Sequence, residues 1–292
     1  MHSYAAEPTS TVLHLGPALA IVIVLLAIAA AAILWLGHTG HHWAALWASV
    51  RGGAQLAILA LVIGLVIHNL WATAVFVILM ATIAALTATS RITRTRPTPR
   101  AALAVAAAVC IWPIGLTLVL IPAGVLPANG LAIIPTAGIM LGSAMNTASL
   151  TGRRANDELG TRGGEVEAAL SLGLLPFDAR MQVCRDAAAT ALVPALDQTR
   201  TVGLVTIPGA FVGMVLGGAR PAEAAAMQLF VLVGILAVSA VSLVSTTILI
   251  AGGPLYRPTA AAGTPRRSAR RLLAGRQRAP GAAAPNRLRP RG

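Results

Sequence analysis

The sequence contains no lysine, and all 22 of its basic residues are arginine. Without lysine, the chain lacks the phosphate-binding lysine of a nucleotide P-loop and the amine that forms a Schiff base. It also lacks the His-Glu-x-x-His pattern of metalloproteases and the Gly-x-Ser-x-Gly pattern of serine hydrolases. We therefore predict a non-catalytic chain without a cofactor of its own, which cannot hydrolyse ATP at a Walker-type site.

Acidic residues and cysteines are also scarce, with nine of the former and two of the latter. Cys110 lies in an apolar run and Cys184 in a polar one, so neither a disulfide nor a cysteine metal site is expected. The spacing of His38, His41 and His42 can hold a metal, but a solvated loop is the commoner case, and we predict no metal site. The long apolar runs contain no acidic residue, which weakens the case for a proton-coupled carrier.

Apolar residues, by contrast, are abundant. The chain is 57% hydrophobic and 11% charged, and its mean hydropathy is +0.78. A soluble domain of this size cannot bury so much apolar surface, so we predict an all-α polytopic protein of the lipid bilayer. Seven segments approach or exceed the roughly 20 residues of a bilayer crossing: 12–36, 43–67, 71–89, 101–121, 131–150, 202–218 and 224–250.

The arginines predict the orientation of these spans. Arg91, Arg94, Arg96 and Arg100 crowd the loop after the third span, whereas the loop 122–130 carries no charge. By the positive-inside rule, the first of these loops is cytoplasmic. We predict an external N-terminus, a cytoplasmic C-terminus and a multi-pass location in the inner (plasma) membrane.

The C-terminal tail accounts for much of the net charge of +13. Residues 254–292 contain ten arginines and no acid. We predict a transmembrane permease domain over 1–253 and a disordered Arg/Pro/Ala-rich cytoplasmic tail over 254–292, attracted to anionic lipid. The positive charge does not form a basic face with interleaved aromatics, so no nucleic-acid partner is expected.

A polar interval, residues 151–200, separates the fifth and sixth predicted spans. It holds seven of the nine acidic residues together with six arginines, so its charges nearly balance. The pattern from Glu165 to Gly173 is that of a short amphipathic helix ending at glycine, and Pro176 offers the start of the next helix. This cytoplasmic helix-turn-helix either packs on the membrane domain as a cap or docks into an ATPase subunit.

Within the predicted spans, two kinds of residue stand out. Small residues at four-residue spacing form smooth stripes that favour close helix packing, or that line a pathway or a dimer seam: Gly138, Gly142, Gly209, Gly213 and Gly217. Polar and soft side chains are candidates for lining a pathway, and the alternative for the amides is an interhelical hydrogen bond. These candidates are Gln55, Met140, Ser143, Met145, Asn146, Met214 and Gln228.

Several of these motifs, taken in order, resemble the UPF0014 family of ABC-transporter permeases over roughly residues 51–250. They are Arg51-x-x-x-Gln55-Leu56, Pro135…Gly138-Ile-Met-Leu-Gly142-x-Ala-Met145-Asn146, Glu167…Leu170-x-Leu-Gly173 and Pro208-Gly209…Gly213-x-x-Leu216-Gly217-Gly218…Gln228. Separately, Glu167-Ala-Ala-x-x-x-Gly173 resembles the opening of the motif by which such permeases engage their ATP-binding subunit. The family usually has asparagine where Ser143 stands, a departure that bears on the substrate.

The resemblance implies a homodimeric permease that works with a separate ABC ATP-binding subunit, on which ATP and Mg²⁺ are bound. It assigns coupling to that subunit to Glu165, Glu167, Ala168, Ala169 and Gly173, and it implies export of iron, another metal or a small solute. Two other classes remain open: an ATP-independent secondary carrier or channel, and a non-transporting membrane scaffold.

Overall fold

The computed structural model describes residues 16–66, 69–94 and 98–256, and most of the predicted tail lies outside these ranges. The described residues are almost entirely helical, and their only β feature is an isolated bridge between Val202 and Thr206. The predicted all-α class is therefore confirmed. The chain forms two compact units that divide between Asn69 and Leu70.

The first unit consists of α1 (Pro17–Leu36) and α2 (His42–Val66), which pack against each other. Ala31 is the one buried residue among the described side chains of these two helices. Helices so apolar and so exposed are suited to lipid or to another protein surface. In the loop between them, Nδ1 of His41 lies 2.6 Å from the carbonyl oxygen of Thr39. Among the described residues, no group of three His, Cys, Asp or Glu side chains could hold a metal.

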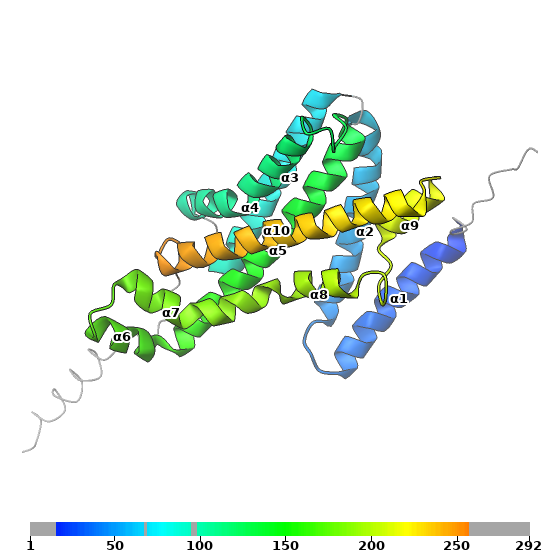
Figure 1. Ribbon diagram of the computed structural model, residues 1–292. Helices are drawn as coiled ribbons and strands as arrows, with labels where there is room; N and C mark the ends of the chain where they lie inside the picture. Colours follow the sequence, from blue (N-terminus) through cyan, green and yellow to red (C-terminus); the bar gives the residue numbers. More distant parts are fainter. Residues whose placement is uncertain (1–15, 67–68, 95–97, 257–292) are drawn as a thin grey trace, which may run out of the picture. The chain divides into compact units, whose positions relative to one another are not determined.

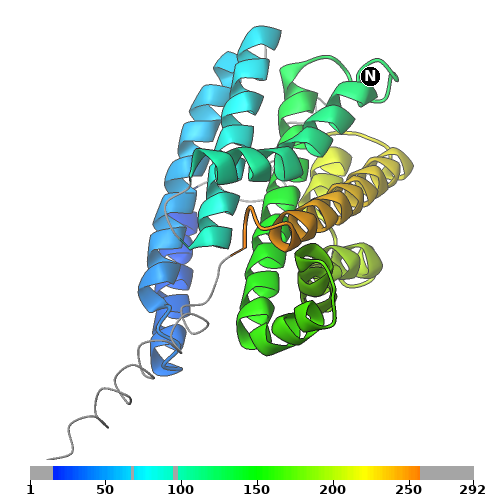
Figure 2. The same ribbon diagram turned by 90° about the vertical axis from the view of Figure 1, so that its left-hand side faces the viewer.

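The second unit is built around α5 (Gly130–Thr161), which packs against α3 (Leu70–Thr93), α4 (Pro99–Leu120), α7 (Pro176–Ala189) and α10 (Pro221–Ala251) (Figure 1, Figure 2). The Asn129 side chain begins α5 by accepting a hydrogen bond from the amide of Ala132 at 2.9 Å. The buried face of α5 is rich in alanine. Because these side chains are small, the neighbouring helices can approach α5 closely.

Helix α5 extends into the polar interval. We expected the fifth span to stop at residue 150, but α5 continues to Thr161 and carries the first part of the interval as three further turns. The rest of the interval forms α6 (Gly163–Ser171), α7, a 3-10 turn (Thr190–Leu192) and α8 (Val193–Thr201). The polar insert is thus a rigid extension of a membrane helix followed by short helices.

The helices α5 and α10 run in the same general direction and cross at an angle (Figure 1). Ser242 donates a hydrogen bond to the carbonyl of Ala144 at 3.0 Å, and one turn beyond α10 the Asn156 amide donates to the carbonyl of Leu255 at 3.2 Å. Neighbours that run in the same direction require the chain between them to return from one end to the other. Figure 1 shows this return, in which α7, α8 and α9 (Gly209–Leu216) follow one another along α10.

The prediction of a continuous helix over 202–218 is wrong. The carbonyl of Thr201 accepts amide hydrogen bonds from Val205 and Thr206, which closes a turn at the end of α8. Gly203 adopts a φ of +81°, and helix α9 begins only after Pro208. With 8 residues, α9 is about 12 Å long, far short of the roughly 30 Å hydrocarbon layer.

Six helices of the described residues are long and apolar enough to cross a membrane, whereas the sequence predicted seven. The segment 162–220 nevertheless leads from the C-terminal end of α5 back to the N-terminal end of α10. If this segment crosses the membrane as a broken helix, it adds one crossing to the six long helices and makes the total odd. The number of crossings and the orientation therefore stay predictions.

Candidate functional site

The first candidate region is the junction between α5 and α6, where Arg162 joins the two helices. Its guanidinium donates to Glu158 on α5 at 3.1 Å and to Glu165 on α6 at 2.6 Å, with a second hydrogen bond to the other oxygen of Glu165. The hydrogen bonds from Arg162 to Glu165 lower the pKa of the Glu165 carboxyl below its ordinary value. Exposed ion pairs stabilise a fold little, but a two-pronged contact of this kind restrains the angle between two helices.

The far end of α6 is a tight turn that exposes leucines. Gly173 has a φ of +93°, and its amide donates to the carbonyl of Leu170 at 3.0 Å. This left-handed conformation favours glycine and explains why the helix ends there. Leu172 is 83% exposed and Leu175 67% exposed. Neighbouring exposed leucines on a polar domain are typical of a surface that binds another protein.

The predicted coupling residues lie on two sides of α6. Glu165, Ala168 and Ala169 line a groove of about 630 Å³ between α6 and α7, together with Arg185 and Asp186 among others. Glu167 lies outside this groove and is exposed. Gly173 forms the turn itself. The structure thus gathers all five on one short helix and the turn after it.

Helix α7 ties this region to the ends of α5 and α10. Arg180 donates a hydrogen bond to the carbonyl of Ala251 at 3.0 Å, and its guanidinium carbon lies 4.7 Å from the centre of the Tyr256 ring. A movement of α7 would therefore reach the C-terminal end of α10. Sequence reasoning missed Arg180 because its partner is a backbone carbonyl 71 residues away.

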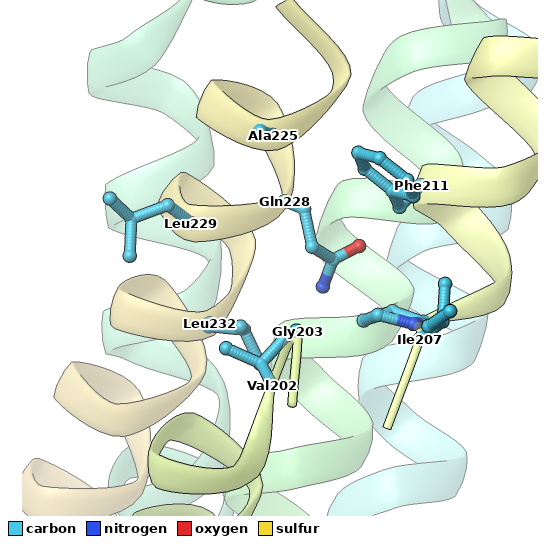
Figure 3. Close-up of a pocket in the computed structure, with 9 residues that line it drawn as sticks. Val202, Gly203, Ile207, Phe211, Ala225, Gln228, Leu229 and Leu232 are labelled. Carbon is cyan, nitrogen blue, oxygen red and sulfur yellow. The ribbon is translucent and has the colours of Figure 1, made fainter. Parts of the chain in front are cut away.

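The second candidate region is a cavity of about 320 Å³ between α10 and the break that separates α8 from α9 (Figure 3). Gln228 points into it from α10 and is only 7% exposed. Among the described residues, its Oε1 has no hydrogen-bond partner. All the other lining residues are apolar or glycine: Val202, Gly203, Ile207, Pro208, Phe211, Ala225, Leu229 and Leu232.

The other residues predicted to line a pathway are not brought to this cavity. Met140 and Met145 belong to the packed interior of the second unit, and Ser143 is half-buried. Asn146 is exposed and accepts a hydrogen bond from Arg91 on α3 at 3.3 Å. Met214, on α9, is half-buried outside the cavity lining. Gln55 is exposed on α2, in the first unit.

The predicted glycine stripes differ in their surroundings. A Cβ at Gly138 would lie 2.8 Å from the Met80 side chain. Gly142, Gly209 and Gly213 have open space within 4 Å, and Gly217 has only carbonyls of its own helix nearby. For Gly142, Gly209, Gly213 and Gly217, close helix packing stays a prediction, and the packing partner would have to lie outside this unit.

Two close approaches that sequence reasoning missed are at Gly152 and Gly234. An added Cβ would meet Ile92 at 2.5 Å in the first case and Met140 at 2.7 Å in the second. Gly152 continues a four-residue repeat of small residues with Ala144 and Ala148, a signal that could have found it, whereas Gly234 belongs to no such repeat.

Comparison with known proteins gives one family. The family model "Uncharacterised protein family (UPF0014)" matches residues 17–252. The rice (Oryza sativa subsp. japonica) "UPF0014 membrane protein STAR2" is 32% identical over 237 residues, 80% of this chain and 81% of that relative. The "UPF0014 membrane protein YjkA" of Bacillus subtilis (strain 168) is 30% identical over 203 residues, 69% of this chain and 80% of that relative.

A third relative carries a functional name. The "Probable iron export permease protein FetB" of Escherichia coli (strain K12) is 33% identical over 129 residues, which are 44% of this chain and 50% of that relative. No solved structure matches the chain.

Proposed function

Because this chain belongs to the UPF0014 family of membrane proteins, we propose that it is the membrane-spanning permease subunit of an ABC transporter in the plasma membrane. In this proposal, a separate subunit binds ATP and Mg²⁺ and hydrolyses the nucleotide. The chain itself supplies the pathway and the contact through which the partner drives it. The observation that carries the proposal is the α6 turn, an exposed apolar tip fixed to the end of the central helix α5.

Three contacts support a mechanical role for this tip. Arg162 restrains α6 against α5, α7 packs against α5, and Arg180 holds the C-terminal end of α10. Closure of the ATP-binding subunits would push on α6, and these contacts would transmit the movement to α5 and α10. A change in the spacing of α10 from the α8–α9 break would then open or close the cavity at Gln228.

The cargo in this proposal is iron, another metal or a small solute, moved outward. Iron export appears in the name of the Escherichia coli relative. Among the described residues no cluster of metal-ligating side chains exists, which favours a metal that travels as a complex. We further propose that two copies pair, because the open glycine faces of Gly142 and of α9 leave room for the backbone of another helix.

The coupling role is tested by reversing one charge on the exposed face of α6. When the full chain is co-expressed with ATP-binding subunits encoded near it, Glu167→Arg should reduce the amount of subunit that co-purifies at least about tenfold, because the change places a cation where the proposed interface has an anion. Asp197→Arg, a reversal at an exposed position on α8, should leave co-purification unchanged. Wild-type assembly in the Glu167→Arg variant would refute the coupling assignment.

A transport measurement on the same purified proteins distinguishes an ABC permease from an ATP-independent secondary carrier. The purified chain in liposomes should move no solute until the ATP-binding subunit and ATP are added. Transport by the chain alone would favour an ATP-independent carrier or channel instead.

A further inference from the structure

We propose that the cavity at the α8–α9 break is the cargo site and that it accepts a neutral, largely apolar molecule that donates one hydrogen bond to Gln228. A hydrated metal ion does not suit this site. The inference rests on the proposed transport function, and it names the chemical class of the cargo.

The position of the cavity is the first argument. Non-helical backbone is tolerated at membrane depth only where protein buries it or where it lines a cavity, because lipid offers no hydrogen bonds. In the proposed broken crossing, the non-helical stretch 202–208 lies at membrane depth, and Val202, Gly203, Ile207 and Pro208 from it form part of the cavity wall. Helices that are broken at membrane depth often form substrate sites in transporters.

The chemistry of the lining is the second argument. The cavity wall carries no charged side chain, and its single polar side chain is Gln228. A cation that entered would exchange its hydrating water for the single amide oxygen of Gln228, at a cost of many kcal/mol. The unpartnered Oε1 of Gln228 instead accepts one N–H or O–H group. The volume of about 320 Å³ falls at the small end of the range for ligand pockets.

Further buried polar side chains on the face of α10 that carries Gln228 are the third argument. Positions 228, 232, 235, 239, 242 and 246 recur at alternating spacings of four and three, so they share one face of α10. The apolar Leu232 and Ile235 follow Gln228 on this face, and the polar side chains resume at Ser239. On this face, Ser239 and Thr246 are each 1% exposed, and their hydroxyl oxygens have no partner among the described residues.

Buried polar atoms are nearly always hydrogen-bonded. The unpaired atoms along this face are therefore suited to a guest that moves past them when α10 separates from α5. The polar part of this face begins at Ser239 and extends toward the C-terminal end of α10, which lies beside the helices of the polar interval.

The test uses two matched fluorescent probes with the full chain in lipid nanodiscs. Naphthalen-2-ol has an apolar body and one O–H donor, whereas 2-methoxynaphthalene has nearly the same body without the donor. The wild-type chain should bind the first about tenfold more tightly than the second, after subtraction of partition into empty nanodiscs. Equal binding of the two probes, or binding of neither, would overturn the proposal.

Two variants locate the site and one serves as a control. Gln228→Leu should abolish the preference for the donor while keeping the apolar cavity, and Ala225→Phe should fill the cavity and abolish the binding of both probes. Gln198→Leu, at an exposed position on α8, should behave as the wild type. A preference that survives in Gln228→Leu would place the donor contact elsewhere and refute the assignment.

The outcome is separable from that of the transport proposal. Probe binding is measured without any ATP-binding subunit, and co-purification of that subunit is measured for the same Gln228→Leu variant. Normal co-purification with no probe preference in the wild type would overturn only the cargo class. A wild-type probe preference in a chain that binds no ATP-binding subunit would overturn only the ABC permease.

Discussion

At Gly152 the backbone of α5 approaches α3 so closely that a single methyl group would disturb the contact. An added Cβ would lie 2.5 Å from Cγ1 and 2.8 Å from Cγ2 of Ile92, which is fully buried. A β-branched side chain in a packed interior has few alternative rotamers. We expect Gly152→Ala to lower the free energy of unfolding by about 1–3 kcal/mol, the usual cost of overpacking, as measured by thermal unfolding in detergent.

Gly142, ten residues earlier on the same helix, provides the matched control. An added Cβ there would meet nothing within 4 Å, and alanine favours helix more than glycine does. Gly142→Ala should therefore leave the unfolding temperature of a single chain unchanged or raise it. Equal losses at the two positions would contradict the helix packing described for α3 and α5.

The buried glutamine and hydroxyls are a different case at the same scale. Among the described residues, the buried side-chain oxygens of Thr151, Gln228, Ser239 and Thr246 have no hydrogen-bond partner. An unpaired buried polar atom costs stability. A protein keeps such a costly atom where function requires it. Our proposal therefore rests on Gln228 and not on the buried methionines.

At the scale of single elements, the junction of α5 and α6 should depend on pH. Arg162 lowers the pKa of Glu165, so the charged contact is complete above the ordinary glutamate pKa of about 4.3 and is lost as the pH falls through the lowered value. Spin labels at Arg153→Cys and Ser171→Cys, in a chain with Cys110→Ala and Cys184→Ala, should give a narrow distance distribution at pH 7. That distribution should broaden well below pH 4.

The variant Arg162→Gln controls for other effects of acid. Its distance distribution should already be broad at pH 7 and should change little on acidification, because the partner of Glu165 is gone. A distribution that stays narrow in this variant would mean that helix packing, and not Arg162, sets the angle of α6.

The element that departs most from expectation is the broken helix. Its signals are visible in the sequence: Gly203, Pro208 and Gly209 all disfavour a continuous helix. The high hydropathy of 202–218 nevertheless predicts a continuous membrane span. Hydropathy averages side-chain transfer free energies over a window and does not register where a backbone hydrogen bond is missing.

For the whole molecule, the decisive question is whether the segment 162–220 crosses the membrane. Single cysteines at Ser171, on α6, and at Ala219, just before α10, lie at opposite ends of this return path. In intact cells, a membrane-impermeant maleimide should label Ala219→Cys and spare Ser171→Cys, because the positive-inside rule places the polar interval with its six arginines in the cytoplasm.

In inverted membrane vesicles the two results should exchange. A background of Cys110→Ala and Cys184→Ala removes the native thiols. If the two positions are labelled from the same side, the broken crossing does not exist and the number of crossings is even.

The sequence by itself determined the class of this protein. Its helices, its membrane environment, the polar interval and the α6 turn at Gly173 all follow from composition, periodicity and local backbone preferences. These quantities depend on neighbours in the chain, so they can be derived without coordinates. The resemblance to UPF0014 also rests on short local motifs, and the family comparison bears it out.

Only the tertiary structure decided which residues meet. Three contacts join positions far apart in the chain: the pairing of α5 with α10, the hydrogen bond from Arg180 to Ala251 and the close approach of Gly152 to Ile92. The tertiary structure also shows that the buried Oε1 of Gln228 has no partner among the described residues. Most side chains of a membrane helix are apolar, so hydropathy alone does not say which face meets another helix and which meets lipid. Close packing of complementary shapes makes that choice, and it requires both surfaces at once.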